Sequence, residues 1–149
     1  MKIASKSFAI ASWSLLFGGI FHSLSDLLSP NTPEKIKIMA EMKALTSQVL
    51  GSEFNMFSFF QGFSLMMGLL IFGYGALNVM FLKHNSQKNL PWNILVLNTI
   101  ITLVCVIISI QYFFFIPIIL TGIPFVGFFI SLITNALPDT GPGTANECL

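Results

Sequence analysis

Long apolar segments dominate the chain, and nearly all charged residues lie outside them. The apolar segments cover residues 7–28, 54–82 and 93–137, and Asp26, near the end of the first, is the one charged residue within them. A helix of about 20 apolar residues is long enough to cross the hydrocarbon core of a bilayer. The last segment is too long for one crossing, so we divide it before Pro117, a residue suited to the start of a helix. The pattern predicts membrane-spanning helices over residues 7–28, 54–82, 93–112 and 117–137.

The connection between the first two predicted spans has a different pattern. Thr32 is suited to cap a helix that begins at Pro33, with Glu34 in its first turn. Apolar residues then recur at helical spacing among charged ones, at Ile38, Met42, Leu45 and Val49. Gly51 is typical of a residue that ends a helix. We therefore predict an amphipathic helix over residues 33–50 that either lies on the membrane surface or covers the mouth of the bundle.

Composition supports a membrane protein and argues against nucleic-acid binding. Only 9% of the residues are charged, whereas soluble domains carry about 25%. The net charge is +1 and the chain has no arginine, so no basic surface for phosphates is indicated. The predicted fold class is an all-α membrane protein, an up-down bundle of four transmembrane helices with an amphipathic helix in the first loop. The turn-rich tail over residues 138–149 is predicted to be disordered.

Small residues inside the predicted spans are interpreted as packing residues. Glycine lets two membrane helices approach closely, and the second span contains Gly62, Gly68, Gly73 and Gly75. Cys105 lies in the third span and Cys148 in the tail, so we expect neither a disulfide between them nor a metal site.

The distribution of lysines predicts the orientation of the spans. Four crossings place both termini on one side of the membrane, with Lys2, Lys6, Lys83 and Lys88. The lysines on the opposite side are diluted by acidic residues in the long first connection. Because lysines close to the spans favour the cytoplasmic side, we predict that both termini are cytoplasmic.

Polar residues near the ends of three predicted spans form one candidate site. His22 and Asp26 are four residues apart and share a helix face. In an up-down bundle, the end of the first span, the start of the second and the end of the third reach the same membrane face. The candidate ligand-binding cluster is therefore His22, Asp26, Asn55, Gln61, Gln111 and Tyr112. These residues either hydrogen-bond one another, which is the favoured interpretation, or form a ligand or proton site in which Asp26 orients His22.

The sequence contains no motif typical of catalysis, metal binding or cofactor binding. No serine lies in a nucleophile-elbow pattern, and no predicted span contains a pair of carboxylates. We expect a non-enzymatic protein that binds membrane lipid or a lipid-like molecule, or an accessory subunit of a membrane protein partner. Two alternatives are a membrane enzyme that acts on a lipid or quinone with His22 as acid/base, and a subunit of a homo-oligomeric transporter.

Three segments also carry a resemblance to known proteins. They are residues 19–22 (GIFH), 55–64 (NMFSFFQGFS) and 111–117 (QYFFFIP). With these segments the chain resembles a family of small bacterial four-helix integral membrane proteins of unknown function. The resemblance covers most of the chain except the tail. It implies the four-helix architecture and a location in the bacterial inner membrane, and it implies no reaction.

Overall fold

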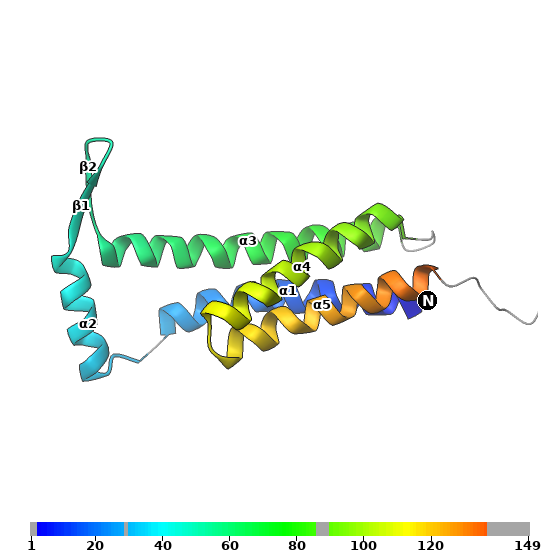
Figure 1. Cartoon of the computed structure of the whole chain (residues 1–149), viewed down its shortest axis with the longest axis horizontal. Helices are drawn as coiled ribbons and strands as arrows, with labels where there is room; N and C mark the ends of the chain where they lie inside the picture. Colours follow the sequence, from blue (N-terminus) through cyan, green and yellow to red (C-terminus); the bar gives the residue numbers. More distant parts are fainter. Residues whose placement is uncertain (1–2, 29, 86–89, 137–149) are drawn as a thin grey trace, which may run out of the picture. The chain divides into compact units, whose positions relative to one another are not determined.

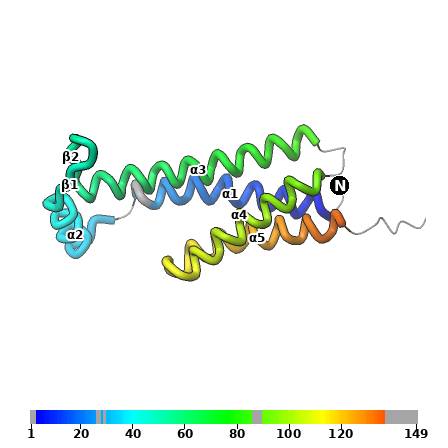
Figure 2. Tube along the Cα trace, turned by 45° about the horizontal axis from the view of Figure 1, so that its top comes forward, coloured from blue at the N-terminus to red at the C-terminus, as the bar shows by residue number. Residues whose placement is uncertain are grey.

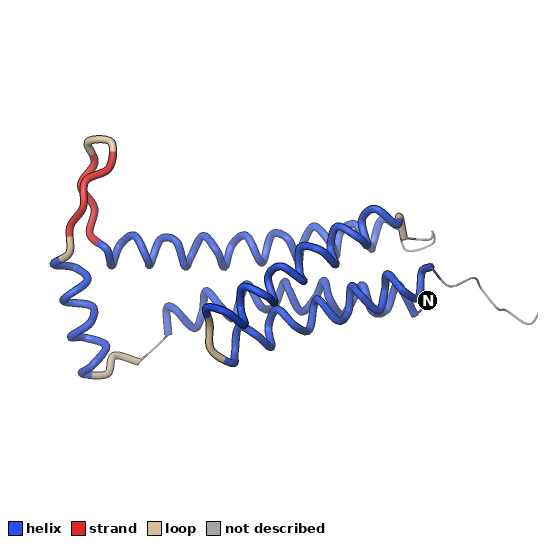
Figure 3. The backbone as a smooth tube through the Cα atoms, viewed as in Figure 1, coloured by secondary structure: helices blue, strands red, loops and turns tan. Residues whose placement is uncertain are grey.

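A computed structural model of the chain describes residues 3–28, 30–85 and 90–136, without the side chains of Asp26 and Leu27. This part of the chain is mostly helical (Figures 1 and 3). The predicted disorder of residues 138–149 lies outside it. The elements are α1 (Ile3–Leu28), α2 (Pro33–Ala44), β1 (Thr46–Val49), β2 (Ser52–Asn55), α3 (Met56–His84), α4 (Trp92–Tyr112) and α5 (Phe115–Ala136).

Four helices in the described part, α1, α3, α4 and α5, are long and apolar enough to cross a membrane. At about 1.5 Å per residue, even the shortest of them reaches the roughly 30 Å of a bilayer core. The prediction of four such helices is confirmed, and the structure is consistent with an all-helical membrane protein. The up-down arrangement of all four stays a prediction, because the chain divides into two compact units that are described separately.

We call residues 13–78 the central unit and residues 1–12 with 79–149 the terminal unit. In the central unit, α1 and α3 run antiparallel, and glycines bring their backbones together. A Cβ atom added to Gly19 would lie 2.7 Å from the carbonyl oxygen of Gly68, and one added to Gly75 would lie 2.9 Å from the carbonyl carbon of Leu15. The predicted packing role is thus confirmed for Gly68 and Gly75.

The remaining two glycines of that prediction behave differently. No atom lies within 4 Å of the position that a Cβ would take at Gly62 or Gly73. Their predicted role in close helix contact stays a prediction, because within the central unit neither meets α1.

Helix α2 begins as predicted but ends early. The Thr32 side chain accepts a hydrogen bond from the Lys35 backbone N–H at 3.2 Å, and Pro33 is the first helical residue. The helix stops at Ala44, so the predicted helix is wrong over residues 45–50. Thr and Val favour strands, and Ser competes with helical hydrogen bonds. Of the predicted apolar stripe only Ile38 and Met42 remain in α2, and Ile38 is exposed.

A two-stranded hairpin takes the place of the missing helical turns. β1 pairs antiparallel with β2, from Thr46 opposite Asn55 to Val49 opposite Ser52. The two residues between the strands, Leu50 and Gly51, have φ angles of 51° and 82°. Two successive positive φ angles are what a type I′ hairpin turn requires. Gly51 is therefore a turn residue and not the end of a helix.

The core of the terminal unit lies where the first turns of α1 meet α5. Phe8 is fully buried, with its ring centroid 5.1 Å from that of Phe128 on α5 and 6.1 Å from that of Phe81 at the end of α3. The Ser131 hydroxyl donates a hydrogen bond of 2.9 Å to the carbonyl oxygen of Ala4. These contacts run antiparallel along the two helices.

Helices α4 and α5 lie side by side in the same unit (Figures 1 and 2). Only residues 113–114 connect them. Near this connection the Thr121 hydroxyl donates to Ser109 Oγ at 3.2 Å. At the other end the Asn135 side-chain amide donates to the carbonyl oxygen of Leu90 at 3.1 Å. Polar contacts therefore join the α4–α5 pair at both ends.

Candidate functional site

The six residues of the predicted cluster fall in both units. His22, Asp26, Asn55 and Gln61 belong to the central unit, whereas Gln111 and Tyr112 belong to the terminal unit. Their convergence on one site stays a prediction.

The central unit gives His22 a defined partner. Its Nε2 atom lies 3.2 Å from the Ser64 hydroxyl of α3, and both side chains are half-buried. The ring also covers Gly68, where an added Cβ would lie 3.3 Å from His22 Cδ2. The missing side chain of Gly68 thus makes room chiefly for the Ser23 hydroxyl, which an added Cβ would meet first, and also for the edge of the His22 ring.

Sequence reasoning missed Ser64. The available signal was its spacing, because Ser64 and Gly68 are four residues apart and lie on one face of α3. Once Gly68 is known to face α1, Ser64 must face it too.

The other predicted residues of the central unit have different surroundings. Asn55 is the last residue of β2, and its side-chain oxygen accepts a hydrogen bond of 2.8 Å from the Ser58 backbone N–H. This is the geometry of an N-cap, which satisfies a free donor at the start of α3. Gln61 is exposed on α3. The side chain of Asp26 lies outside the described part, so its predicted pairing with His22 is untested.

Gln111 and Tyr112 end α4 in the terminal unit. Both side chains are exposed. Both side chains therefore lie on the surface of this unit.

The terminal unit also contains a groove that the sequence did not predict. It has a volume of about 470 Å³ and runs between α1 and α5. Its walls include Ser7 and Ile10 of α1 and Gly122, Ile123, Val126 and Ile130 of α5. No atom lies within 4 Å of a Cβ position at Gly122, so this glycine leaves the groove open.

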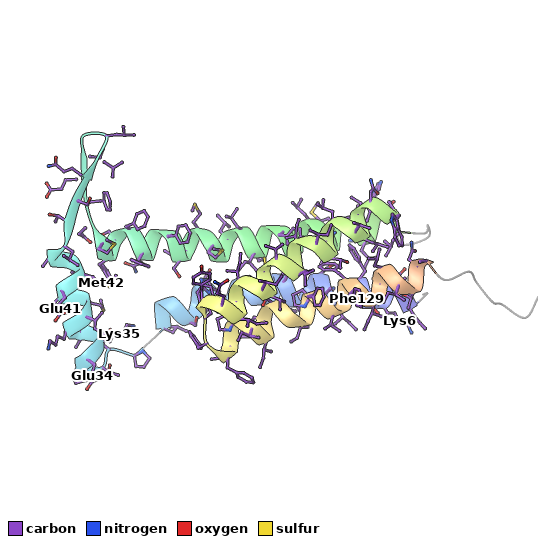
Figure 4. The ribbon with its side chains drawn as sticks, in the orientation of Figure 1. Lys6, Glu34, Lys35, Glu41, Met42 and Phe129 are labelled. Carbon is purple, nitrogen blue, oxygen red and sulfur yellow. The ribbon has the colours of Figure 1, made fainter. Side chains whose placement is uncertain are left out.

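The groove has a mostly apolar wall, and a lysine precedes one of its lining residues in the chain. Along α5 it extends from Ile119 to Ile130, which corresponds to roughly 16 Å at the helical rise of 1.5 Å per residue. Ser7 is its hydroxyl-bearing residue, and Lys6, the preceding residue, is exposed (Figure 4). An apolar groove of this length is suited to an alkyl chain.

Among the described residues, no three His, Cys, Asp or Glu side chains are grouped closely enough to hold a metal ion. Cys105 is exposed on α4 with a free thiol.

The resemblance to small bacterial four-helix membrane proteins rests on the residues quoted for it, and the inner-membrane location is likewise a prediction. No protein-family model, curated protein or solved structure matches this chain.

Proposed function

We propose that this chain is an integral membrane protein that crosses the bilayer four times as an up-down bundle and holds a lipid-like molecule by its acyl chain, without catalysing a reaction. The groove between α1 and α5 carries the proposal. Its walls offer aliphatic C–H groups and the Ser7 hydroxyl, so an apolar chain fits their chemistry. Both helices are long and apolar enough to span a membrane, which makes lipid the nearest source of such a chain.

The selectivity of this groove cannot come from hydrophobicity. A lipid tail is as well solvated by other lipids as by protein, so binding depends on close fit and on polar contacts. Close fit comes from Gly122, where the missing side chain leaves space for an acyl chain to lie against the helix. Polar attraction is supplied by Lys6, since a lysine near the membrane surface attracts anionic headgroups by about 1 kcal/mol. An anionic amphiphile is therefore the favoured ligand.

The test fills the groove without disturbing the fold. Gly122→Leu places a side chain where no atom now lies within 4 Å. Gly73→Leu is the matched control, because Gly73 has equally open space but lies on α3, outside the groove. Both variants and the parent are extracted gently and weighed by native mass spectrometry.

We expect the parent and Gly73→Leu to retain a bound lipid that Gly122→Leu has lost. A parent without bound lipid, or an equal lipid load on all three proteins, would reject the groove as a binding site. A polypeptide retained in place of lipid would favour the accessory-subunit role instead.

The proposed orientation places both termini on the cytoplasmic side of the bacterial inner membrane. Lys6 at the start of α1 and Lys83 at the end of α3 support it, because both are exposed and close to a span. A fluorescent protein that folds only in the cytoplasm, fused to the C-terminus, should be bright. A dark fusion combined with an active periplasmic reporter would reverse the orientation.

A membrane enzyme with His22 as acid/base is the second candidate, favoured by the contact between Nε2 and the Ser64 hydroxyl. A serine beside a histidine base can act as a nucleophile toward a lipid ester. A fluorophosphonate probe should then label the parent but not Ser64→Ala or His22→Gln. Absence of labelling in the parent would leave this contact a structural hydrogen bond.

A further inference from the structure

The β1–β2 hairpin has an apolar face, which carries its two large apolar side chains beside two serines, and a wholly polar face. Side chains alternate between the faces of a strand, and directly paired residues share a face. Val49 and Phe54 therefore lie on one face, together with Ser47 and Ser52. Gln48 and Glu53 lie on the other face, with Thr46 and Asn55.

The apolar face continues onto an exposed aromatic surface of α3. The ring of Phe54 lies 5.5 Å from that of Phe59, and the ring of Phe59 is stacked 6.4 Å from that of Phe63. Phe59, Phe60 and Phe63 are each at least half exposed. On a membrane-spanning helix, aromatic side chains with this exposure face lipid. The hairpin thus joins the exposed aromatic side of α3 through its own apolar face.

The tip of the hairpin is strained and uncovered. Leu50 is 101% exposed and has a φ of 51°. That conformation is unfavourable for a residue with a Cβ atom, and Gly, or Asn with its short polar side chain, would adopt it more easily. A large apolar side chain in this conformation gains nothing from contacts within the chain. Its surroundings must therefore account for it.

We infer that the hairpin is a membrane-interface anchor, with Val49 and Phe54 against the headgroup region and Leu50 inserted among the acyl chains. The inference rests on the membrane location proposed above. Connectivity supports it, because β2 passes directly into α3 with no residue between Asn55 and Met56. The hairpin is therefore held at the end of α3, as Figure 3 shows.

Residues around the hairpin suit the same interface. Lys43 of α2 places its Nζ 5.0 Å from the ring centroid of Phe57, at the start of α3. A lysine can cover apolar surface with its stem while its charge remains near headgroups. Glu34 and Glu41 on α2 are exposed (Figure 4) and would remain in water.

The experiment measures the surroundings of single positions in the full chain. Spin labels are attached at Leu50→Cys, Gln48→Cys or Leu69→Cys in a Cys105→Ser, Cys148→Ser background, in vesicles of phosphatidylcholine and phosphatidylglycerol. Leu69 is an exposed position within α3 and serves as the lipid reference. Collisions of each label with oxygen, which dissolves in lipid, are compared with collisions with a water-soluble nickel chelate.

Labels at positions 50 and 69 should collide with oxygen several-fold more than with nickel, and the label at position 48 should show the reverse. A water-exposed label at 50 beside a lipid-exposed label at 69 would overturn the anchor alone. A water-exposed label at 69 would overturn the membrane location on which both proposals rest.

A second variant addresses the tip without removing the turn. Leu50→Asn keeps a residue that tolerates positive φ, and a label at Val49→Cys reports on the hairpin. The nickel accessibility of that label should rise several-fold when Leu50 is replaced. Unchanged accessibility would show that Leu50 does not hold the hairpin in the membrane.

Discussion

Helix α1 contacts a neighbour in each unit, and the two contacts are built in opposite ways. In the central unit, Gly19 and Gly75 omit their side chains, so that backbone meets backbone. In the terminal unit, the large ring of Phe8 fills the space against Phe128. Lipid gives helices no hydrophobic gain on pairing, so both contacts depend on fit. The difference shows that a helix can obtain this fit either from a missing side chain or from a large one.

Each contact also includes a polar bond of a different kind. In the terminal unit, fully buried Ser131 donates to the backbone of α1. In the central unit, half-buried Ser64 contacts the side chain of His22. A rigid backbone acceptor and complete burial should make the first bond the stronger of the two.

The largest effect is expected from adding a side chain at the glycine contact. Gly75→Leu would force a branched side chain against the backbone of Leu15, and such overpacking costs up to about 3 kcal/mol. Gly73→Leu, two residues away in open space, should be close to neutral. The free energy of unfolding is measured by titrating mixed micelles with dodecyl sulfate. Equal losses in both variants would show that the glycine contact does not hold the helices.

Removing the large ring should have the next largest effect. Phe128→Ala leaves a cavity beside Phe8, and the cavity alone costs about 2 kcal/mol. The loss is smaller than in a water-soluble core, because a side chain in a membrane protein was never transferred from water and only the cavity term remains. Phe129→Ala is the neighbouring control, since Phe129 is exposed and stacks on Phe125 of the same helix. If that variant lost as much stability, tight packing at Phe8 could not be the cause.

Removing the buried hydroxyl should cost less. Ser131→Ala deletes the hydrogen bond to Ala4, and such bonds between membrane helices contribute about 1 kcal/mol. Thr134→Ala is compared with it, because the Thr134 hydroxyl bonds within its own helix, to Ile130. A neutral Ser131→Ala would indicate that α1 and α5 are held by apolar packing alone.

The smallest effect is expected for the central unit's polar contact. Ser64→Ala removes the partner of His22 and should cost about 0.6 kcal/mol, the average for hydrogen bonds between membrane helices. Ser58→Ala on the same helix is the control, since Ser58 donates to Asn55 through its backbone N–H, which the substitution keeps. A loss larger than that of Ser131→Ala would reverse the proposed ranking of the two contacts.

Sequence patterns predicted the features that depend on composition or on a few adjacent residues. The polar stretch between the second and third apolar segments predicted a break there, and α3 ends at His84 and α4 begins at Trp92. The cap of α2 was also predictable, since Thr32 needs only the backbone N–H three residues later.

The hairpin could not be predicted, because its turn departs from the usual signal. Asn-Gly or Asp-Gly marks a type I′ turn, whereas this turn has Leu50 before Gly51. The helical spacing of Ile38 and Met42 continued by chance to Leu45 and Val49, which lie outside α2.

The site residues depend on how helices align, which one sequence does not record. Gly73 and Gly75 are equivalent by composition, yet only the second meets α1. The contact between His22 and Ser64 and the groove beside Gly122 both require the register of helices distant in the chain.

The two-residue connection between α4 and α5 has a consequence for biosynthesis. If both helices cross the membrane as proposed, so short a link keeps their linked ends at one membrane surface, and we expect them to insert together as one helical hairpin. The linking residues are Phe113 and Phe114, so this step carries no charge across the membrane in the proposed orientation. In the same proposed orientation, the first connection, with three lysines and three glutamates over residues 34–53, would have to be translocated against the cost of its charges.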